Sequence, residues 1–290
     1  MKRILITGQN SYIGNSLETW LEKAPEPYRV DKVSLRDSNW EYRDFSDYDV
    51  ILHTAGIAHI SSDPNMEETY FKVNRDLTIK AAEKAKADGV KQFIFMSSII
   101  VYTGCYGEQG IITKETVPDP KSYYGQSKIQ AEQGIKDLRS EKFKIAILRP
   151  PMIYGKNGKG NYPKLSRFAR LMPIFPDIEN QRSMLHIDNL CQFVKQLIDY
   201  EAGGLYFPQN KEYVKTSELI KTIRRVHGKR TYLVNLFNPI VKRVARQGIM
   251  NKVFGNLVYE KAMSEYEKFD YRIRSFEESI ELTERGSVSS

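Results

Sequence analysis

Two residues four positions apart, Tyr124 and Lys128, have the types and spacing of an acid–base pair. On a helix they would lie on one face, one turn apart. A free tyrosine has a pKa of about 10, but a neighbouring ammonium stabilises the phenolate and lowers that pKa. A decrease of about three units needs roughly 4 kcal/mol of differential interaction. We predict that Tyr124 exchanges a proton with a substrate oxygen, and that Ser98 holds this oxygen from the end of a strand.

A glycine-rich turn stands far upstream of this pair, between an apolar run at 3–7 and a predicted helix. In the pattern Gly8-x-x-Ser11-x-x-Gly14, Gly8 allows the tight turn, and the helix N-terminus presents backbone N–H groups to a pyrophosphate. Ser11 occupies the position of the usual middle glycine. With the tyrosine–lysine pair, the turn predicts an enzyme that uses a nicotinamide cofactor to move a hydride to or from a hydroxyl-bearing carbon. The oxidised nicotinamide ring would add to the effect of the lysine on Tyr124.

Composition and charge exclude several other classes of protein. The 290 residues carry a formal net charge of +8, which is scattered along the sequence, and no nucleic-acid-binding motif accompanies it. We therefore expect no nucleic acid partner, and a basic protein suits a small anionic substrate. No apolar run is long enough to span a membrane and the first residues do not resemble a signal peptide, so no stable membrane insertion is expected.

Cysteine and histidine usage indicates a cytoplasmic protein without a metal. Cys105 and Cys191 form no disulfide framework, as is usual in a reducing compartment. The four histidines have no metal-ligand spacing, so we expect no metal site.

Short apolar runs alternate with helical patterns through the first half of the chain. We predict strands at 3–7, 30–35, 50–54, 92–97 and 144–149, and helices at 16–23, at 66–88 and around Tyr124. This alternation predicts the α/β class, with a Rossmann-like doubly wound parallel sheet that carries helices on both faces. Ligands bind at the carboxyl ends of such strands, where Thr7, Ala55, Ser98 and Pro150 fall.

The regular alternation loosens after Pro151, and we divide the chain accordingly. The predicted parts are a dinucleotide-binding domain at 1–160 with 187–201 returning to it, a smaller discontinuous C-terminal substrate lobe at 161–186 and 202–285, and a disordered tail at 286–290. Further helices are expected near 164–171, 188–200 and 217–226. The segment 239–254 is basic and amphipathic, and we interpret it as a helix of the small lobe with a solvated face rather than as a membrane-surface helix.

Four motifs occur together along the chain. They are Thr7-Gly8-x-x-Ser11-Tyr12-Ile13-Gly14, Ser97-Ser98 with Val101-Tyr102, Tyr124-x-x-x-Lys128 and Leu148-Arg149-Pro150. This combination resembles the extended short-chain dehydrogenase/reductase family, the NAD-dependent epimerase/dehydratase group that acts on nucleotide sugars. Residues 149–155, 160–163 and 180–183 resemble, within that group, bacterial capsule-pathway enzymes that reduce a UDP-4-keto-6-deoxy-N-acetylhexosamine at C4. UDP-hexose and UDP-N-acetylhexosamine 4-epimerases are near relatives of those enzymes.

The resemblance implies a role for each matching residue. Ser98, Tyr124 and Lys128 would be the catalytic set; the first two would contact substrate, and Lys128 would also hold the nicotinamide ribose. The residues implied to bind the cofactor are Gly8, Ser11, Tyr12, Ile13 and Gly14 at the pyrophosphate, Ala55 and Gly56 beside the adenosine ribose and phosphate, Asn74 at the strand ends, and Pro150 and Met152 beside the nicotinamide. Asn161 and Arg182 match positions that hold the UDP diphosphate, for which an arginine is well suited.

One position departs from the pattern of the NAD-using members. They usually end the second strand with an aspartate that binds the adenosine ribose, whereas Ser34 stands there and Arg36 follows two residues on. A small hydroxyl and an arginine suit the extra phosphate of NADP(H), so we favour NADP(H) over NAD(H). A shift of a few residues would make Asp31 or Asp37 the ribose ligand and favour NAD(H) instead.

The sequence thus indicates a cytoplasmic, NAD(P)-dependent 4-reductase of a UDP-sugar in capsule or cell-surface polysaccharide synthesis. A 4-epimerase needs the same residues and stays open as the alternative. A dehydratase is disfavoured because 97–102 lacks the usual Asp-Glu pair. A dinucleotide-sensing scaffold would not need the intact catalytic set. The resemblance also implies a homodimer, with the helices at 66–88 and 123–139 pairing across a two-fold axis.

Overall fold

The structure is a computed structural model, and it describes residues 1–57, 64–104, 110–235, 238 and 255–285. Cys105, the basic segment 239–254 and the tail 286–290 lie outside the described residues. What the sequence predicts for them stays a prediction.

Six parallel strands form the main sheet, in the spatial order β10-β6-β4-β3-β1-β2. Their bounds are β1 Lys2–Thr7, β2 Tyr28–Val33, β3 Val50–His53, β4 Gln92–Met96, β6 Lys144–Leu148 and β10 Gly204–Tyr206. β3 and β4 are buried at every residue because a parallel sheet is covered on both faces, which explains their uninterrupted apolar sequences. The predicted Rossmann-like doubly wound sheet is confirmed.

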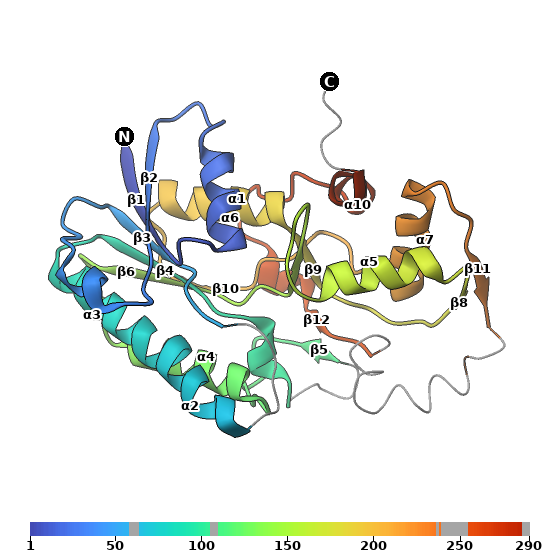
Figure 1. Cartoon of the computed structure of the whole chain (residues 1–290), viewed down its shortest axis with the longest axis horizontal. Helices are drawn as coiled ribbons and strands as arrows, with labels where there is room; N and C mark the ends of the chain where they lie inside the picture. Colours follow the sequence, from blue (N-terminus) through green and yellow to red (C-terminus); the bar gives the residue numbers. More distant parts are fainter. Residues whose placement is uncertain (58–63, 105–109, 236–237, 239–254, 286–290) are drawn as a thin grey trace.

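Helices cover both faces of this sheet (Figure 1). α1 and α6 lie on one face, and α3 and α4 lie on the other. Their bounds are α1 Tyr12–Leu21, α6 Ile187–Asp199, α3 Leu77–Ala87 and α4 Tyr123–Lys136. Side chains alternate along a strand, so Ile4 and Ile6 join the core under α1 and α6 while Leu5 joins the core under α3 and α4.

The winding of the sheet reverses at β1. β2 pairs with one side of this strand and β3 with the other, and Thr7 stands opposite His53 at the carboxyl ends of β1 and β3. Ligands of open parallel sheets bind outside the carboxyl ends of the strands at such a reversal. The turn that begins at Gly8 and the pair Ala55-Gly56 therefore open onto the same edge.

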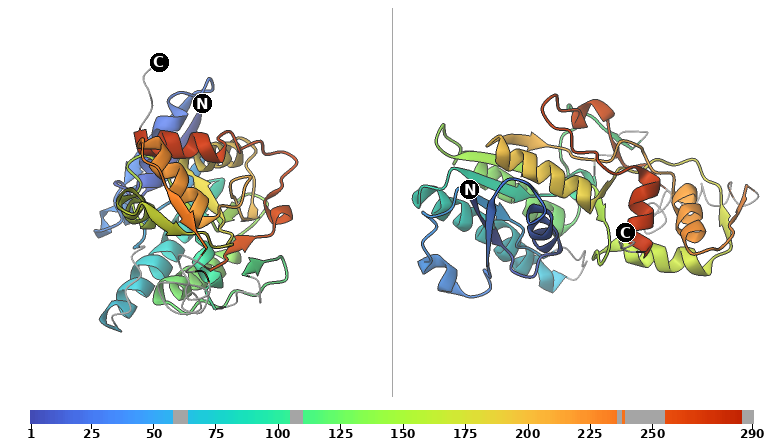
Figure 2. Two further views of the ribbon diagram at one scale, coloured as in Figure 1. Left: turned by 90° about the vertical axis from the view of Figure 1, so that its right-hand side faces the viewer. Right: turned by 90° about the horizontal axis from the view of Figure 1, so that it is seen from above.

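A second lobe lies beside the sheet and has a core of its own, which includes Tyr154, Tyr162, Phe175, Leu219 and Ile280 (Figure 2). Its helices are α5 Asn161–Leu171, α7 Thr216–Val226 and α10 Phe276–Arg285. Three pairs of short parallel strands complete the described part of the chain: β7 Met152–Tyr154 with β9 Met184–His186, β8 Ile174–Pro176 with β11 Tyr232–Val234, and β5 Ile111–Ile112 with β12 Val258–Tyr259.

The observed boundaries differ from the predicted ones in identifiable ways. β2 ends at Val33 instead of 35, and α1 begins at Tyr12 instead of 16. β10 belongs to the main sheet, whereas our division of the chain placed 202–285 in the small lobe; three residues are too few to show a strand period in sequence. The predicted helix at 66–88 consists of several segments, which are α2 Glu67–Tyr70, the π-helical η3 Phe71–Asp76 and α3. The remaining short helical turns are η1 Ser38–Tyr42, η2 Pro64–Met66, η4 Ile99–Tyr102 and η5 Lys261–Ser264.

Candidate active site

The glycine turn brings the ends of β1 and β3 into contact. Gly8 has a φ of +93°, in the region that favours glycine, and its backbone N–H donates to the Val33 carbonyl at 3.0 Å. A Cβ at Gly8 would lie 3.0 Å from the backbone nitrogen of Ala55 and 3.1 Å from its Cα. Only a glycine therefore lets the three strand ends approach this closely.

Ser11 has a definite structural task at the start of α1. Its side chain caps the helix by accepting a hydrogen bond from the Gly14 N–H at 3.2 Å. A Cβ at Gly14 would lie 2.8 Å from Cγ2 of Ile6, so the helix rests directly on β1. The helix N-terminus is thereby held at the carboxyl edge of the sheet, where its free N–H groups favour an anion.

Tyr12 and Ile13, the next two residues, are half-buried against the core beneath α1. Burial raises the pKa of the Tyr12 phenol, so the group stays neutral. A Cβ at Gly155 would lie 2.6 Å from the Tyr12 hydroxyl. Tyr12 therefore joins the glycine turn to the loop that follows β7.

Ser98 and Tyr124 meet at the carboxyl end of β4. Ser98 caps η4 and accepts from the Ile100 N–H at 3.3 Å, and Ser122 caps α4 one turn ahead of Gly125. Burial raises the pKa of Tyr124 to about 12, and a hydrogen bond with the Ser98 side chain opposes this rise. The Tyr124 ring also lies 6.3 Å from the ring of Tyr70.

Lys128 lies one turn further along α4 and is buried. Its Nζ donates to the Met96 carbonyl at 2.8 Å and stands 4.7 Å from the centroid of the Phe95 ring. Burial lowers the pKa of Lys128 to about 8, although the Glu132 carboxylate opposes this. Lys128 was expected to lower the pKa of Tyr124. In the free chain the pKa of Tyr124 is instead raised, because desolvation of the phenolate dominates.

Asn74 connects the loop after β3 to the helix that carries Tyr124. Its Oδ1 accepts from the Ile57 N–H at 2.9 Å, and its Nδ2 donates to the Ile57 carbonyl and to Ser127 Oγ, both at 3.1 Å. Gly56 packs against this group, because a Cβ there would lie 2.8 Å from Asn74 Oδ1 and 3.5 Å from Lys128 Nζ. Asn74 lies in the π-helical turn η3, a geometry that is frequent at functional sites.

Residues 4–206 match the model of the NAD dependent epimerase/dehydratase family. This span is more than half of the chain, and it contains the glycine turn and the residues that converge at β4. The chain belongs to the NAD dependent epimerase/dehydratase family.

Relatives and solved structures of similar proteins agree with this assignment. The chain is 28% identical over 288 residues to a UDP-glucose 4-epimerase of Vibrio cholerae, which covers 88% of this chain and 86% of that protein. It is 25% identical to a GDP-6-deoxy-D-mannose reductase of Pseudomonas aeruginosa, over 77% of this chain and 79% of that protein. The structure of RMD from Pseudomonas aeruginosa, complexed with NADPH, superposes with a TM-score of 0.74 over 98% of this chain and 99% of that chain, at 20% identity, which shows the shared fold.

Members of this family use a nicotinamide dinucleotide, and the residues present at the edge of the sheet fit one. A side chain at Gly8 or Gly56 would collide with Ala55 or Asn74, so bare backbone lines this edge. The capped N-terminus of α1 offers N–H groups to a pyrophosphate. Lys128 and Asn74 lie next to Gly56 on the side toward Ser98.

Ser34 directly follows β2, beside Gly8, and accepts from the Arg36 N–H at 3.3 Å. Arg36 is exposed. The two carboxylates nearest in sequence, those of Asp31 and Asp37, accept hydrogen bonds from other residues of the chain. Asp31 lies within β2 and accepts from the Tyr48 hydroxyl at 3.1 Å, and Asp37 caps η1 by accepting from the Asn39 N–H at 3.0 Å.

Pro150 and Met152 lie between the carboxyl end of β4 and the second lobe. The Pro150 carbonyl accepts from the Ile99 N–H at 2.9 Å, and Met152 pairs with Met184 in β9. Arg182 precedes Met184 by two residues, so it stands at the same end of the β7–β9 pair as Pro150.

Arg182 is held by its own lobe. Its backbone pairs with Val214 and Leu257, and its Nη1 donates to the Gly255 carbonyl at 3.1 Å. Asn161 is exposed at the first position of α5. The structure thus gathers Ser98, Tyr124 and Lys128 with the glycine turn, while no hydrogen bond among the described residues joins Arg182 or Asn161 to them.

A buried ion pair that sequence reasoning missed involves α4, the helix that carries Tyr124 and Lys128. Glu132 follows Lys128 by one helical turn, and its Oε2 is 2.5 Å from Nη2 of Arg149. Both side chains are buried, and Arg149 also donates to the Tyr102 hydroxyl at 2.5 Å while Ser97 donates to Glu132. The pair connects α4 to the end of β6. Its only sequence signal was a glutamate at helical spacing after Lys128.

His53 is a second missed residue. It is completely buried at the end of β3, with Nδ1 2.9 Å from Thr7 Oγ1 and Nε2 3.0 Å from Thr78 Oγ1. The Thr78 hydroxyl donates to the Asn74 carbonyl at 2.8 Å, so it must accept from a protonated Nε2. Burial lowers the pKa of His53 to about 3, so the imidazole is neutral near pH 7, and Nδ1 then accepts from the Thr7 hydroxyl.

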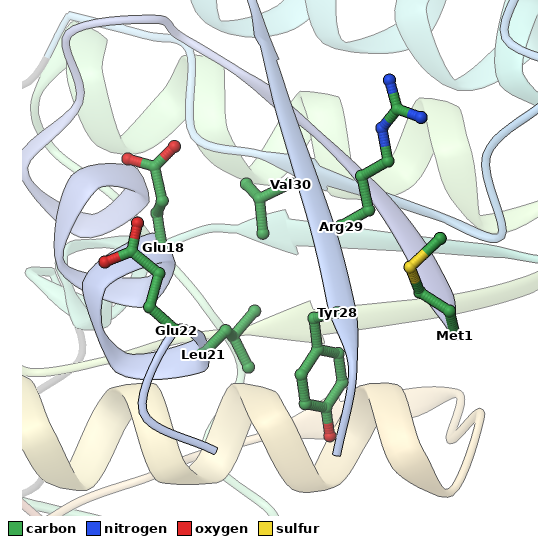
Figure 3. Close-up of a pocket in the computed structure, with 7 residues that line it drawn as sticks. All are labelled: Met1, Glu18, Leu21, Glu22, Tyr28, Arg29 and Val30. Carbon is green, nitrogen blue, oxygen red and sulfur yellow. The ribbon is translucent and has the colours of Figure 1, made fainter. Parts of the chain in front are cut away.

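A hollow elsewhere on the molecule is unrelated to this chemistry. A space of about 370 Å³ lies between α1 and the start of β2. Figure 3 shows residues that line it, among them Met1, Leu21 and Tyr28. This space lies at the amino edge of the sheet, opposite the carboxyl edge that carries the glycine turn. Among the described residues, no group of three or more His, Cys, Asp or Glu could hold a metal ion.

Proposed function

We propose that this family member reduces the C4 carbonyl of a UDP-4-keto-6-deoxy-N-acetylhexosamine in capsule or cell-surface polysaccharide synthesis, as a cytoplasmic homodimer. The observation that carries the proposal is the meeting of Ser98 and Tyr124 beside Lys128, at the end of β4 and next to the glycine turn. This arrangement suits the delivery of a proton to a substrate oxygen at the place where a dinucleotide fits.

The bound dinucleotide supplies the hydride that reduces C4. Tyr124 gives its phenolic proton to the C4 oxygen, and Ser98 holds that oxygen through its hydroxyl. A pKa of about 12 keeps Tyr124 protonated near neutral pH, which suits a proton donor and thus the direction of reduction. Lys128, whose pKa burial lowers to about 8, provides a donor that orients the ribose next to Gly56.

The surroundings of Ser34 support NADPH as the preferred reductant. Asp31 and Asp37 each already accept a hydrogen bond within the chain, from the Tyr48 hydroxyl and the Asn39 N–H, and the nearest side chain after the end of β2 is the Ser34 hydroxyl. A serine and an exposed arginine can accommodate a phosphate at that position. A reductase consumes its cofactor in every turnover, which suits an exchangeable NADPH.

A 4-epimerase is the second candidate, and the similarity to the Vibrio cholerae epimerase over most of both chains favours it. Such an enzyme would oxidise C4, turn the keto sugar and reduce its other face. It would use Ser98, Tyr124 and Lys128 in the same places, but it would regenerate its own cofactor.

Two incubations distinguish the candidates. Purified protein receives the UDP-4-keto-6-deoxy-N-acetylhexosamine with NADPH or NADH, and separately UDP-glucose or UDP-N-acetylglucosamine with no added reductant. We expect NADPH to be oxidised in step with loss of the keto sugar, faster than NADH, and we expect Arg36→Ala to remove that preference. Epimerisation without added NADPH would instead establish the second candidate. Inactivity in both incubations would reject both.

A further inference from the structure

Five large apolar side chains are exposed on α5, β8, β11 and the turn between α5 and β8. The end of α5 and these two strands lie at the tip of the second lobe, away from the main sheet (Figure 1). The five side chains are Phe168, Leu171, Met172, Ile174 and Tyr232, with exposures of 43%, 70%, 41%, 51% and 60%. We call them the apolar patch. Surface apolar residues that occur singly need no explanation, but a contiguous group marks a surface for interaction.

The apolar patch is continuous because its elements are paired. Ile174 of β8 stands opposite Tyr232 of β11, and the Tyr232 N–H donates to the Pro173 carbonyl at 2.8 Å. The alternating residues Phe175 and Leu233 point inward to the core of the lobe. The inner residues hold the strands in place, and the outer ones are left facing solvent.

Five exposed cations lie near the apolar patch, three on α5 and two in the loop that leads into β11. They are Lys164, Arg167, Arg170, Lys229 and Arg230, which we call the basic rim. On α5, Lys164, Arg167 and Leu171 have helical spacing i, i+3 and i+7 and so share a face. Stretches 161–176 and 226–235 contain no aspartate or glutamate, and no ion pair joins the rim to a carboxylate within the described residues.

A buried arginine fixes the geometry of the basic rim. Arg224 donates from Nη1 to the Ala169 and Arg170 carbonyls at 3.0 and 3.1 Å, and from Nη2 to the Arg230 carbonyl at 2.8 Å. Lys229 Nζ adds a bond to the Arg170 carbonyl at 3.1 Å. These hydrogen bonds join the end of α5 to the loop that leads into β11. Part of the positive charge that is scattered along the sequence is therefore brought together in the folded chain at the basic rim.

We infer that the apolar patch and basic rim dock this protein reversibly on an anionic phospholipid bilayer. Apolar side chains enter the boundary between headgroups and acyl chains, and the flanking Lys and Arg side chains reach the lipid phosphates. A nucleic acid would also attract the cations of the basic rim. It would leave the five side chains of the apolar patch exposed to water, because its phosphate backbone offers them no apolar surface. The docking is peripheral, since no helix among the described residues is long and apolar enough to cross a membrane.

Vesicle co-sedimentation tests this inference without reference to the substrate. The full chain is mixed with vesicles of phosphatidylglycerol and phosphatidylethanolamine, or of phosphatidylcholine alone, at low and at high salt. We expect binding to the anionic vesicles and little to the neutral ones. Charge reversal by Arg167→Glu with Arg170→Glu should weaken binding by about tenfold or more, because each cation near an anionic surface contributes to attraction.

Matched variants distinguish the effect of the apolar patch and basic rim on vesicle binding from the effect of the net charge of the chain. Lys23→Glu with Lys142→Glu changes the net charge equally at exposed positions of the other lobe and should bind vesicles nearly as the original chain does. Leu171→Ser with Ile174→Ser should weaken binding at both salt concentrations, and Tyr232→Ser serves as a milder second variant. Circular dichroism of each variant establishes that it is folded.

Several outcomes would overturn the inference. Absence of binding to anionic vesicles would do so, as would an equal loss in the Lys23 and Lys142 control, which would mean attraction by net charge alone. Short duplex DNA could also displace the protein from the vesicles. If the Arg167 and Arg170 variant then lost DNA binding as well, the basic rim would be assigned to nucleic acid. A change in the oligomeric state of the Leu171 and Ile174 variant, with vesicle binding unchanged, would assign the patch to self-association.

Discussion

Tyr124 keeps its proton in the free chain because burial of its phenol raises the pKa to about 12. A group in this state is prepared to give a proton to an oxygen that gains negative charge. The Ser98 side chain opposes this rise, because a hydrogen bond to the phenolate favours the charged form.

Replacing Tyr124 with phenylalanine should remove this proton donor and keep the packing against Tyr70. We expect turnover to fall by about 10²- to 10⁴-fold while the unfolding temperature changes little. Steady-state kinetics on the keto sugar measures the effect. Tyr123→Phe, one residue earlier on α4, is the matched control and should keep its turnover. Near-normal activity of Tyr124→Phe would remove Tyr124 from the reaction.

His53 should make the protein sensitive to acid. An unfolded chain takes up a proton on this histidine near pH 6.5, whereas the folded chain does so only near its lowered pKa of about 3. Stability is therefore full above pH 6.5 and decreases as pH falls from there toward 3, by at most about 4–5 kcal/mol. His186, whose pKa burial lowers to about 4, adds to the decrease over the same range.

Urea unfolding at a series of pH values measures this dependence. His53→Gln should be less stable at neutral pH, and the decrease in its unfolding free energy toward low pH should be smaller. An unchanged pH slope in this variant would contradict the neutral, buried state of His53.

The residues for which we propose chemistry stand out in the sequence because their spacing is local. Tyr124 and Lys128 belong to one helix, and Gly8 to one turn. The buried residues that support this site, such as His53 and Glu132, could not be recognised, because their hydrogen-bond partners are distant in the chain. Thr7 and His53 are 46 positions apart, and Glu132 and Arg149 are 17 apart. Such pairs are set by strand register and helix packing, which no local pattern reports.

Elements of the main sheet were predictable for a related reason. β3 and β4 are apolar at nearly every position because both faces are covered, and this pattern survives in sequence. The short strands of the second lobe have two or three residues each. β5 is fixed by pairing with β12, which lies more than a hundred positions later, so only the folded chain reveals it.

α10 should be the element on which the second lobe depends. Glu284 accepts hydrogen bonds from Tyr162 and Ser166 at 2.9 Å and pairs with His227 at 2.7 Å, thereby joining α10 to α5 and α7. Glu284→Ala leaves buried donors without a partner, and we expect a loss of about 2–4 kcal/mol of unfolding free energy.

Chemical denaturation followed by tyrosine fluorescence measures this loss. Glu281→Ala, at an exposed position of the same helix, should leave stability within about 0.5 kcal/mol of the original. Equal effects of the two substitutions would mean that helix propensity, and not the hydrogen bonds of Glu284, accounts for the change.

At the scale of the whole molecule, Arg182 stands where the second lobe approaches the carboxyl edge of the main sheet. We expect Arg182→Ala to weaken UDP and UDP-sugar binding together, by about 1.5–3 kcal/mol if a charged hydrogen bond is lost. Calorimetric titration with UDP measures the change. Arg225→Ala, which removes an exposed arginine of α7, should leave UDP affinity intact. Unchanged affinity in Arg182→Ala would place this residue outside the substrate site.

We also expect a homodimer built on the helices at 66–88 and 123–139. The Ile79 side chain fits against Gly134, so α3 and α4 pack closely and present one broad surface. Light scattering at micromolar concentration should give twice the chain mass, and the Leu171→Ser with Ile174→Ser variant should keep that mass because its changes lie on the other lobe. A monomer would contradict this arrangement.

The order in which the chain is synthesised has a consequence for the second lobe. Its core combines α5 near residue 165 with α10 at 276–285, so it cannot close until the ribosome has made more than a hundred further residues. The first five strands of the main sheet can pair in the order of their synthesis, and β10 completes that sheet by residue 206. We therefore expect the main sheet to be nearly complete in the nascent chain before the second lobe can fold. In that interval the apolar side chains of α5 are uncovered, and exposed apolar surface of this kind favours aggregation.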